Sequence, residues 1–338
     1  MLGFNVWITE SCNMRCSYCY ENGKTDKSVH ASIEMLDEIM KFIWSKVRHM
    51  AEDDVVIDIH GGEPLLEFDK VVYFVEHSKR GLDGHNVFYN IGTNGTLLDK
   101  EKAEWLNVSM NSISVSLDGN DKTHNRNRKY INGNGTYADV IQNINDSKID
   151  KKKVRIRMTV NSKTVENLSD SVSHIVDMGF WMIVPAIAYE DECWNKKKLE
   201  YLEDELMKVK MKYKNRGDVM IAMTNRDEIK RKGLCGGGIT KFDILPNGDI
   251  YPCSYVCGLN QYKLGNVCKE MKIDTDKLIV LYTAKNQACD GCTYVKYCLA
   301  TRCKYLNKLN SGDYNMPSDL MCRVENIKYR VCSSMADA

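Results

Sequence analysis

The alternation of strand-like and helix-like segments over the first 190 residues constrains the fold most strongly. Repeated strand–helix units favour parallel strands that are joined by right-handed crossovers. The strand-like segments are short, apolar and rich in β-branched residues; they are Phe4–Thr9, Val55–His60, Val87–Ile91, Ile113–Leu117, Val154–Val160 and Met182–Ile187. We therefore predict an α/β fold, either a doubly wound sheet or a partial (β/α)6 barrel with fewer units than the eight of a TIM barrel.

The composition changes twice along the chain, and each change marks a predicted boundary. Residues 1–190 hold the strand–helix units, and residues 191–232 have the pattern of a helical connector. Its apolar stripe consists of Leu199, Leu202, Leu206, Val209 and Tyr213. From residue 233 onwards Cys, Gly, Asn and Tyr become frequent, and the dipeptide Asn247–Gly248 predicts the turn of a β-hairpin. We predict a barrel domain (1–190), a connector (191–232), a cysteine-rich domain (233–332) and a tail (333–338).

The charge balance and the cysteine content exclude several classes of protein. The 338 residues have a net charge of +1, so no overall basic field directs the chain to nucleic acid or to a membrane surface. No N-terminal stretch has the pattern of a signal peptide, and no apolar window is long enough to span a membrane. We expect a cytoplasmic protein, and disulfides are a poor explanation there for 14 cysteines. Ligation of a metal or of an iron–sulfur cluster explains them better.

Three cysteines follow the first predicted strand with the spacing Cys12-x3-Cys16-x2-Cys19. Three thiolates from one loop can bind three irons of a [4Fe–4S] cube, which leaves the fourth iron open to a small molecule. In a barrel, the carboxyl end of a strand is where active sites lie. A zinc site is the alternative, although zinc sites usually combine paired cysteines into a set of four ligands.

This spacing resembles that of the radical S-adenosylmethionine (SAM) superfamily, and a second motif extends the resemblance. The segment HGGEP follows the second predicted strand and looks like the superfamily's GGEP motif. The resemblance implies that Tyr18 lies against the adenine of SAM and that Glu63 accepts a hydrogen bond from its amino group. The two glycines would let the backbone approach the ligand closely. The candidate SAM contacts in this motif are Gly61, Gly62, Glu63 and Pro64.

Weaker matches follow at the ends of the next two predicted strands. The segment TNG at residues 93–95 resembles the superfamily's TNG turn, and SLDG at residues 116–119 resembles its S-x-D-G motif. His124 and Arg128 fit the H-x3-R that follows, although Asn125 replaces the usual Asp. A charged loop without a ligand role is the alternative. The candidates for contacts with SAM, including its carboxylate or ribose, are Thr93, Asn94, Ser116, Asp118, Arg128 and Arg157.

The resemblance implies a reductive mechanism. An electron from a flavodoxin or from a ferredoxin-type protein enters the cluster, and SAM is cleaved to methionine and a 5′-deoxyadenosyl radical. The radical abstracts a hydrogen atom from the substrate, while the protein supplies orientation and a dry site. The sequence identifies no catalytic side chain.

The C-terminal cysteines resemble those of the SPASM domain, which binds two auxiliary [4Fe–4S] clusters. The spacing is Cys235-x12-Gly248-x4-Cys253, then Cys289-x2-Cys292-x5-Cys298-x4-Cys303-x18-Cys322, with one residue more than usual before Cys303. The resemblance assigns the first auxiliary cluster to Cys235, Cys253 and Cys303. It assigns the second auxiliary cluster to Cys289, Cys292, Cys298 and Cys322.

The fourth ligand of the first auxiliary cluster stays open, because Cys257, Cys268 or an outside group could supply it. A zinc-ribbon-like domain is the alternative for the whole region. Cys193 and Cys332 are expected to be plain thiols. Together with the SAM-binding cluster, the resemblance implies three [4Fe–4S] clusters.

Enzymes with this pair of domains modify peptides and proteins. We expect a maturase of a ribosomally made, Cys-containing peptide that joins a cysteine sulfur to a carbon in a thioether crosslink. Anaerobic sulfatase maturation, which forms formylglycine, is the first alternative; Ser254 replaces the Asp that follows the equivalent of Cys253 in those enzymes, so we expect inefficient formylglycine formation unless Asp249 substitutes. Carbon–carbon crosslinking, epimerisation and a non-catalytic electron carrier are the others. The chain begins at the first predicted strand, so we expect no separate leader-recognition domain.

Overall fold

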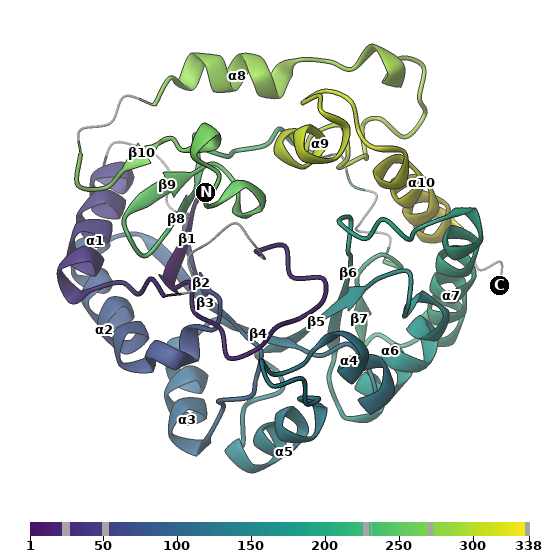
Figure 1. Ribbon diagram of the computed structural model, residues 1–338, viewed down its shortest axis with the longest axis horizontal. Helices are drawn as coiled ribbons and strands as arrows, with labels where there is room; N and C mark the ends of the chain where they lie inside the picture. Colours follow the sequence, from purple (N-terminus) through teal and green to yellow (C-terminus); the bar gives the residue numbers. More distant parts are fainter. Residues whose placement is uncertain (22–27, 49–53, 226–229, 231, 270–272, 335–338) are drawn as a thin grey trace.

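The computed structural model describes residues 1–21, 28–48, 54–225, 230, 232–269 and 273–334. Ten strands in this part of the chain form one sheet in the order β10-β9-β8-β1-β2-β3-β4-β5-β6-β7. The strands from β8 through β1 to β7 run parallel to one another. Figure 1 shows the sheet as an arc with α1, α2, α3, α5, α6 and α7 on its outer side and the C-terminal segment along its open side.

Six strand–helix units build the arc, as predicted for a partial (β/α)6 barrel. Their strands are β1 (Leu2–Thr9), β2 (Asp54–Gly61), β3 (Asn86–Thr93), β4 (Ser112–Ser116), β5 (Val154–Val160) and β6 (Met182–Ile187). The helices between and after them are α1 (Ile33–Arg48), α2 (Phe68–Ser78), α3 (Lys100–Ser109), α4 (Asp121–Asn127), α5 (Tyr137–Ser147), α6 (Leu168–Asp177) and α7 (Lys196–Tyr213).

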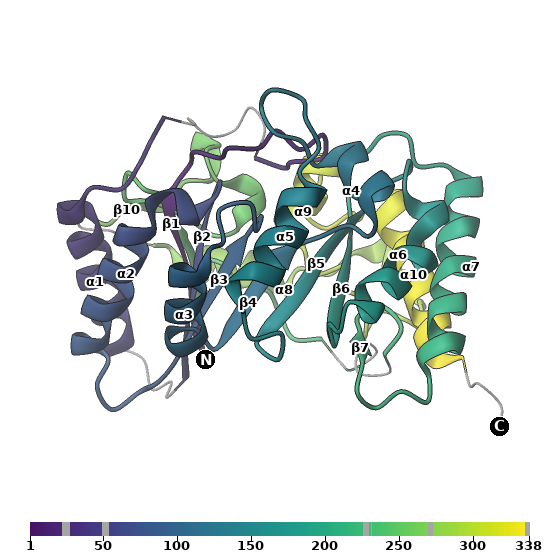
Figure 2. The same ribbon diagram turned by 90° about the horizontal axis from the view of Figure 1, so that it is seen from below.

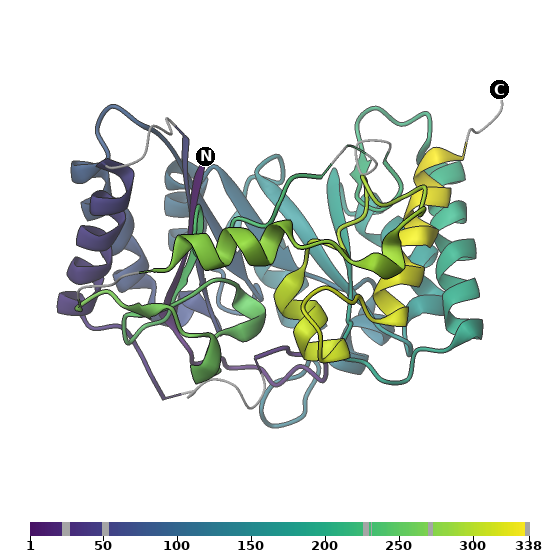
Figure 3. The ribbon, with the colours of Figure 1, turned by 90° about the horizontal axis from the view of Figure 1, so that it is seen from above.

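The C-terminal part of the chain returns to the first strand. After β7 (Met220–Ile221) at one edge, β8 (Lys241–Ile244) pairs in parallel with β1 at the other side of the sheet. The predicted hairpin is confirmed, since β8 pairs antiparallel with β9 (Asp249–Tyr251). The remaining elements are β10 (Gly265–Asn266), α8 (Thr275–Thr283), α9 (Lys304–Ser311) and α10 (Asp319–Ser333). Figure 3, which views the open side of the arc, shows α8 and α9 in front of the strands.

The sheet has an apolar outer face and a more polar inner face. Side chains alternate along a strand, and in β1 Phe4 lies on the outer face, edge-on to Phe42 of α1 with 6.5 Å between ring centroids. Asn5 and Trp7 therefore point to the inner face. The hydrophobic core thus lies between strands and helices, which leaves the inside of the arc for polar side chains.

Local sequence signals explain where several helices begin and end. The Ser32 hydroxyl accepts a hydrogen bond from the Met35 N–H at 3.2 Å, a cap that stabilises a helix by about 1 kcal/mol. The chain leaves α6 through Gly179, whose φ of +85° favours glycine. The predicted stripe of the connector is buried along α7. Among the described residues, no helix combines the length and the apolar character that crossing a membrane requires.

Candidate active site

The loop that holds Cys12, Cys16 and Cys19 lies across the carboxyl ends of the strands (Figure 2). The chain after α4 fixes this loop through backbone hydrogen bonds, because the Ser17 N–H donates to the Asn127 carbonyl at 3.0 Å. The Ser17 hydroxyl also donates to the Asn127 side-chain oxygen at 2.8 Å. The Asn161 side-chain amide donates to the same oxygen at 3.0 Å. The end of α4 therefore holds the loop, and Asn161, which follows β5, holds Asn127 in turn.

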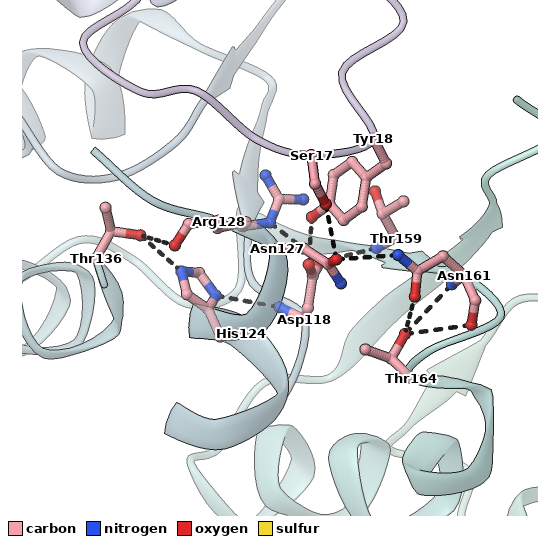
Figure 4. A network of polar contacts seen from close by, with 10 residues as sticks. All are labelled: Ser17, Tyr18, Asp118, His124, Asn127, Arg128, Thr136, Thr159, Asn161 and Thr164. Carbon is pink, nitrogen blue, oxygen red and sulfur yellow. Dashed lines mark hydrogen bonds and ion pairs between the residues drawn. The ribbon is translucent and has the colours of Figure 1, made fainter. Parts of the chain in front are cut away.

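A buried ionic network connects the same loop to the end of β4 (Figure 4). The Asp118 carboxylate accepts a hydrogen bond from the Tyr18 hydroxyl and one from the Thr159 N–H at 2.8 Å. Arg128 forms an ion pair with Asp118, with 3.1 Å between Nε and Oδ1, and its guanidinium lies 5.3 Å from the centroid of the Tyr18 ring. Burial alone would lower the pKa of Arg128, but the negative charges of Asp118, Tyr18 and Cys16 together with the Asp118 hydrogen bond outweigh burial and raise it. Tyr18 is thus held in place by Asp118, which follows β4, and by Arg128, which follows α4.

The thiols of this loop are poor acids in the protein alone. Burial raises the pKa of Cys12 to about 12 and that of Cys16 to about 11. Arg128 partly offsets the shift at Cys16, and the Asn94 side-chain amide donates to the Cys12 sulfur at 3.9 Å. Each of these thiols therefore becomes a thiolate only when a positive charge arrives, and a bound metal supplies such a charge.

The HGGEP turn packs directly against the chain that leads into the cysteine loop. The Gly62 N–H donates to the Thr9 carbonyl at 3.0 Å, and the Glu63 N–H donates to the Ser11 carbonyl at 2.8 Å. A Cβ on Gly61 would lie 2.3 Å from the Thr9 oxygen, and one on Gly62 would lie 2.2 Å from the Ser11 oxygen. Close approach does require these glycines, but the approaching group in the structure is the protein backbone.

Glu63 connects this turn to the TNG turn after β3. Its carboxylate is fully buried and accepts hydrogen bonds from the Thr93 hydroxyl at 2.7 Å, the Asn94 N–H at 2.6 Å and the Leu65 N–H at 3.1 Å. Burial raises the pKa of Glu63 to about 7, against the lowering effect of these donors. The predicted residues Glu63, Thr93 and Asn94 therefore lie together, and Glu63 has a clear structural role.

The inner face of the arc continues the site with further polar groups. The Trp7 and His60 rings lie 4.9 Å apart, and their Nε1 and Nδ1 atoms are buried without a hydrogen-bond partner in the described part of the chain. Burial lowers the pKa of His60 to about 4, and the charge of Arg157 on β5 adds to the shift. Arg157 is exposed and pairs in register with Ser116 of β4. Each buried polar atom without a partner calls for an explanation, and two of them lie together on this inner face.

One inner-face carboxylate lies where β8 meets β1. Asp243 accepts hydrogen bonds from the Asn5 side-chain amide at 2.9 Å and from the Ser254 hydroxyl at 2.5 Å. Burial raises the pKa of Asp243 to about 6, against the lowering effects of Ser254, Asn5 and Trp7. The Trp7 N–H therefore lies close to this carboxylate, although its geometry does not complete a hydrogen bond.

The C-terminal cysteines fall into two groups of neighbours. Burial is the main cause of the raised pKa of Cys253, and the charges of Cys303 and Cys235 add to it. In the other group, burial is the main cause of the raised pKa values of Cys289 and Cys298. The charges of Cys292 and Cys322 add to the shift at Cys289, and the charge of Cys322 adds to the shift at Cys298. These neighbours match the two ligand sets that the SPASM resemblance implies. No three His, Cys, Asp or Glu side chains in the described chain converge on a single metal ion.

The two cysteines that could supply the remaining ligand differ in their surroundings. Cys257 is buried in an apolar cluster with Trp7, Leu245 and Tyr251, and its thiol donates to the Cys253 carbonyl at 3.7 Å. Cys268 is exposed. Asp249, the carboxylate that the sequence suggested near Ser254, instead pairs with Lys263 and Asn266 at the hairpin.

The Asp249 carboxylate lies 2.5 Å from the Lys263 ammonium nitrogen and accepts a hydrogen bond from the Asn266 side-chain amide at 2.7 Å. Of the two cysteines expected to be plain thiols, Cys193 is exposed, and Cys332 is buried with its thiol directed at the Met223 carbonyl at 3.2 Å.

The comparison with protein families decides the identity of the barrel. Residues 7–171 match the model of the radical SAM superfamily. Residues 7–171 are a radical SAM domain. Among curated proteins, the cysteine-type anaerobic sulfatase-maturating enzyme of Clostridium perfringens is 24% identical over 323 residues, which cover 86% of this chain and 85% of that enzyme. The serine-type enzyme of Bacteroides thetaiotaomicron is 33% identical over 139 residues, 40% of this chain and 33% of the relative.

Solved structures share the fold of this radical SAM protein along nearly its whole length. The structure of native anSMEcpe with bound AdoMet and the Kp18Cys peptide has a TM-score of 0.77 at 18% identity, covering 97% of this chain and 96% of that one. Streptococcus suis SuiB bound to its precursor peptide SuiA has a TM-score of 0.65 at 17% identity, covering 95% and 75%. The predicted fold of a radical SAM barrel followed by a SPASM domain is confirmed.

The residues of the radical SAM loop fit an iron–sulfur cluster. The donor set consists of three soft sulfur ligands on one loop, which suits iron, and burial raises the pKa of two of them, Cys12 and Cys16. Arg128 beside Cys16 would partly balance the charge of the thiolates. The residues that would hold the cluster are Cys12, Cys16 and Cys19.

Several functional side chains were missed from the sequence of this radical SAM enzyme. Asn127 and Asn161 fix the cysteine loop, and nothing in their spacing indicates it. Asp243 and Trp7 meet only because β8 docks on β1. The alternation in KFDI does place Asp243 opposite Phe242, so a polar residue inside an apolar strand was the available signal.

Proposed function

We propose that this protein is a peptide maturase that uses radical SAM chemistry to oxidise a cysteine or serine side chain of a protein substrate to an aldehyde. The observation that supports this most is the similarity to a cysteine-type anaerobic sulfatase-maturating enzyme over 86% of the chain, a share too large to be confined to the barrel. The comparisons favour this alternative over the thioether crosslink that we expected from the sequence. Nothing in them supports the crosslink.

The cysteines of the chain divide into three proposed ligand sets. The first, on the loop after β1, would hold the cluster that binds and cleaves SAM, and this bound pair supplies a 5′-deoxyadenosyl radical. The second consists of Cys235, Cys253 and Cys303. The third consists of Cys289, Cys292, Cys298 and Cys322. Three cubes correspond to about 12 irons per chain, and a flavodoxin or ferredoxin-type protein is the proposed electron donor.

The barrel residues would position SAM and the substrate at the mouth of the arc. Tyr18, fixed by Asp118, is the proposed contact for adenine, and Arg157 faces the same interior. The proposed contacts also include Ser116 and the two turns that Glu63 connects. This arrangement would keep the reacting carbon near the radical and away from water.

The test is anaerobic incubation of the iron-loaded protein with SAM, dithionite and a sulfatase peptide that contains the reactive cysteine. We expect a product that has lost sulfur and gained an aldehyde, which mass spectrometry detects and a hydrazide reagent traps. A heat-inactivated sample and a peptide with alanine at the reactive position are the controls. Loss of two hydrogens with one thiol no longer alkylated would instead identify the thioether crosslink, and an unchanged mass with an altered stereocentre would identify epimerisation.

A further inference from the structure

Asp243 differs from five other buried carboxylates of the described chain in what it contacts. Those five accept a hydrogen bond from a backbone N–H or pair with a Lys or Arg: Glu63, Asp118, Glu205, Asp249 and Glu325. Asp243 has only side-chain partners in the described part, namely Asn5 and Ser254. No Lys or Arg in the described part is a partner of this carboxylate, so an ion pair does not explain why it is buried.

Asp243 lies close to two loops, one that carries Cys19 and one that carries Cys253. Its charge contributes, after burial, to the raised pKa values of Tyr20 and Cys253. Tyr20 directly follows Cys19 of the first loop, and Ser254 directly follows Cys253. The Tyr20 and Tyr255 rings lie 5.4 Å apart and connect the two loops. A substrate side chain that reacts between these loops would meet the Ser254 hydroxyl.

We infer that Ser254 and Asp243 form a proton relay that deprotonates the substrate side chain during its oxidation. The inference rests on the proposed function and names the group that accepts the proton. A carboxylate next to a serine hydroxyl can take the serine proton while the serine oxygen takes the substrate proton. Because burial raises the pKa of Asp243 to about 6, the carboxylate is unprotonated at neutral pH and is still basic enough to act.

The oxidation balances with this acceptor. The 5′-deoxyadenosyl radical takes a hydrogen atom from the carbon next to the sulfur or oxygen and becomes 5′-deoxyadenosine. The S–H or O–H proton moves to Ser254 as the Ser254 proton moves to Asp243. The carbon keeps one unpaired electron, and an oxidised [4Fe–4S] cluster, which Cys235, Cys253 and Cys303 would hold, would supply the acceptor for it as the C=S or C=O bond forms. For a cysteine substrate, water then replaces sulfur and hydrogen sulfide is released.

The groups around Asp243 make the relay sensitive to pH in one direction. The titratable neighbours are Asp58 on β2, Tyr20, Cys253 and Cys257, and none of them is basic. Nothing in this set would keep Asp243 ionised below its own pKa. Product formation should therefore fall as the pH drops below about 6.

The test compares an Asp243→Asn variant with an Asp249→Asn control on the loaded enzyme and the sulfatase peptide. We expect the number of modified peptides per 5′-deoxyadenosine to fall by about 100-fold or more in Asp243→Asn. The acid limb of the pH profile should vanish with it. The control should match the wild type in both respects, because Asp249 pairs with Lys263 on the hairpin.

Two further measurements keep the inference testable if Asp243→Asn folds poorly. Ser254→Ala should lower the same ratio, and Ser254→Asp combined with Asp243→Asn should restore part of it by placing a carboxylate at position 254. A measurement that does not depend on turnover is urea unfolding at pH 4 and at pH 7. The urea midpoint of Asp243→Asn minus that of the wild type should be larger at pH 7 than at pH 4.

The outcomes separate the relay from the proposed function. An Asp243→Asn enzyme that modifies peptide like the wild type, with the same pH profile, would overturn the relay and leave the function intact. A wild-type enzyme that forms 5′-deoxyadenosine but never an aldehyde would overturn the function, and the relay with it.

Discussion

Replacing Arg128 by methionine should destabilise the barrel through the charge that it leaves behind. The side chains of Arg128 and Asp118 are 8% and 0% exposed, and their ion pair measures 3.1 Å. Removing one partner of a buried pair typically costs about 3–5 kcal/mol. Asp118 would keep the Tyr18 hydroxyl and the Thr159 N–H as donors, so we expect a loss near the lower end, about 3 kcal/mol.

Urea unfolding of the anaerobically loaded protein measures this loss, with Arg126→Met as the matched control. Arg126 lies exposed on α4, two residues before Arg128, so its replacement should change stability by no more than about 0.5 kcal/mol. Adding Asp118→Asn to Arg128→Met removes the unpaired charge, and the double variant should lose less than the sum of the single losses. An Arg128→Met protein that unfolds within about 1 kcal/mol of the wild type would refute the reasoning.

Three further variants test other parts of the account. Replacing Cys12, Cys16 and Cys19 together by alanine should abolish 5′-deoxyadenosine formation and lower the iron content from about 12 to about 8 per chain, whereas surviving SAM cleavage would defeat the assignment. A Cys257→Ala protein should keep its iron, because the thiol packs against Trp7, Leu245 and Tyr251; a loss of about 4 irons would show instead that Cys257 is a ligand. Asp243→Asn should gain about 2.4 kcal/mol relative to the wild type between pH 4 and pH 7, since a folded-state pKa raised from 3.8 to about 6 destabilises the native state as the pH rises through that window; an equal difference at both pH values in urea unfolding would contradict this.

Much of the barrel was predictable because its signals are local. The strands predicted at Val154–Val160 and Met182–Ile187 have the observed bounds, and the Ser32 cap and the Gly248 turn depend only on neighbouring residues. The pairing of β8 with β1 was not predicted, because it joins Asn5 to a residue 238 positions later and no local pattern specifies the partner.

The sequence of α10 contains a helical pattern that could have been predicted. In α10, the apolar residues Met321, Val324, Ile327 and Val331 are buried and recur at helical spacing, which predicts a helix in this cysteine-rich segment. The site divides in the same way. Motif residues such as Tyr18 and Glu63 are recognisable in the sequence, but their hydrogen-bond partners come from strands far along the chain.

The most direct test of the central claim follows a hydrogen atom from the substrate into the cofactor product. A sulfatase peptide is prepared with deuterium on the β-carbon of its reactive cysteine and is incubated with the loaded enzyme, SAM and dithionite. Mass spectrometry of the 5′-deoxyadenosine then reports the origin of the abstracted atom. The account predicts one deuterium in 5′-deoxyadenosine, in step with aldehyde formation on the peptide. 5′-Deoxyadenosine that carries no deuterium while the peptide stays unmodified would contradict it.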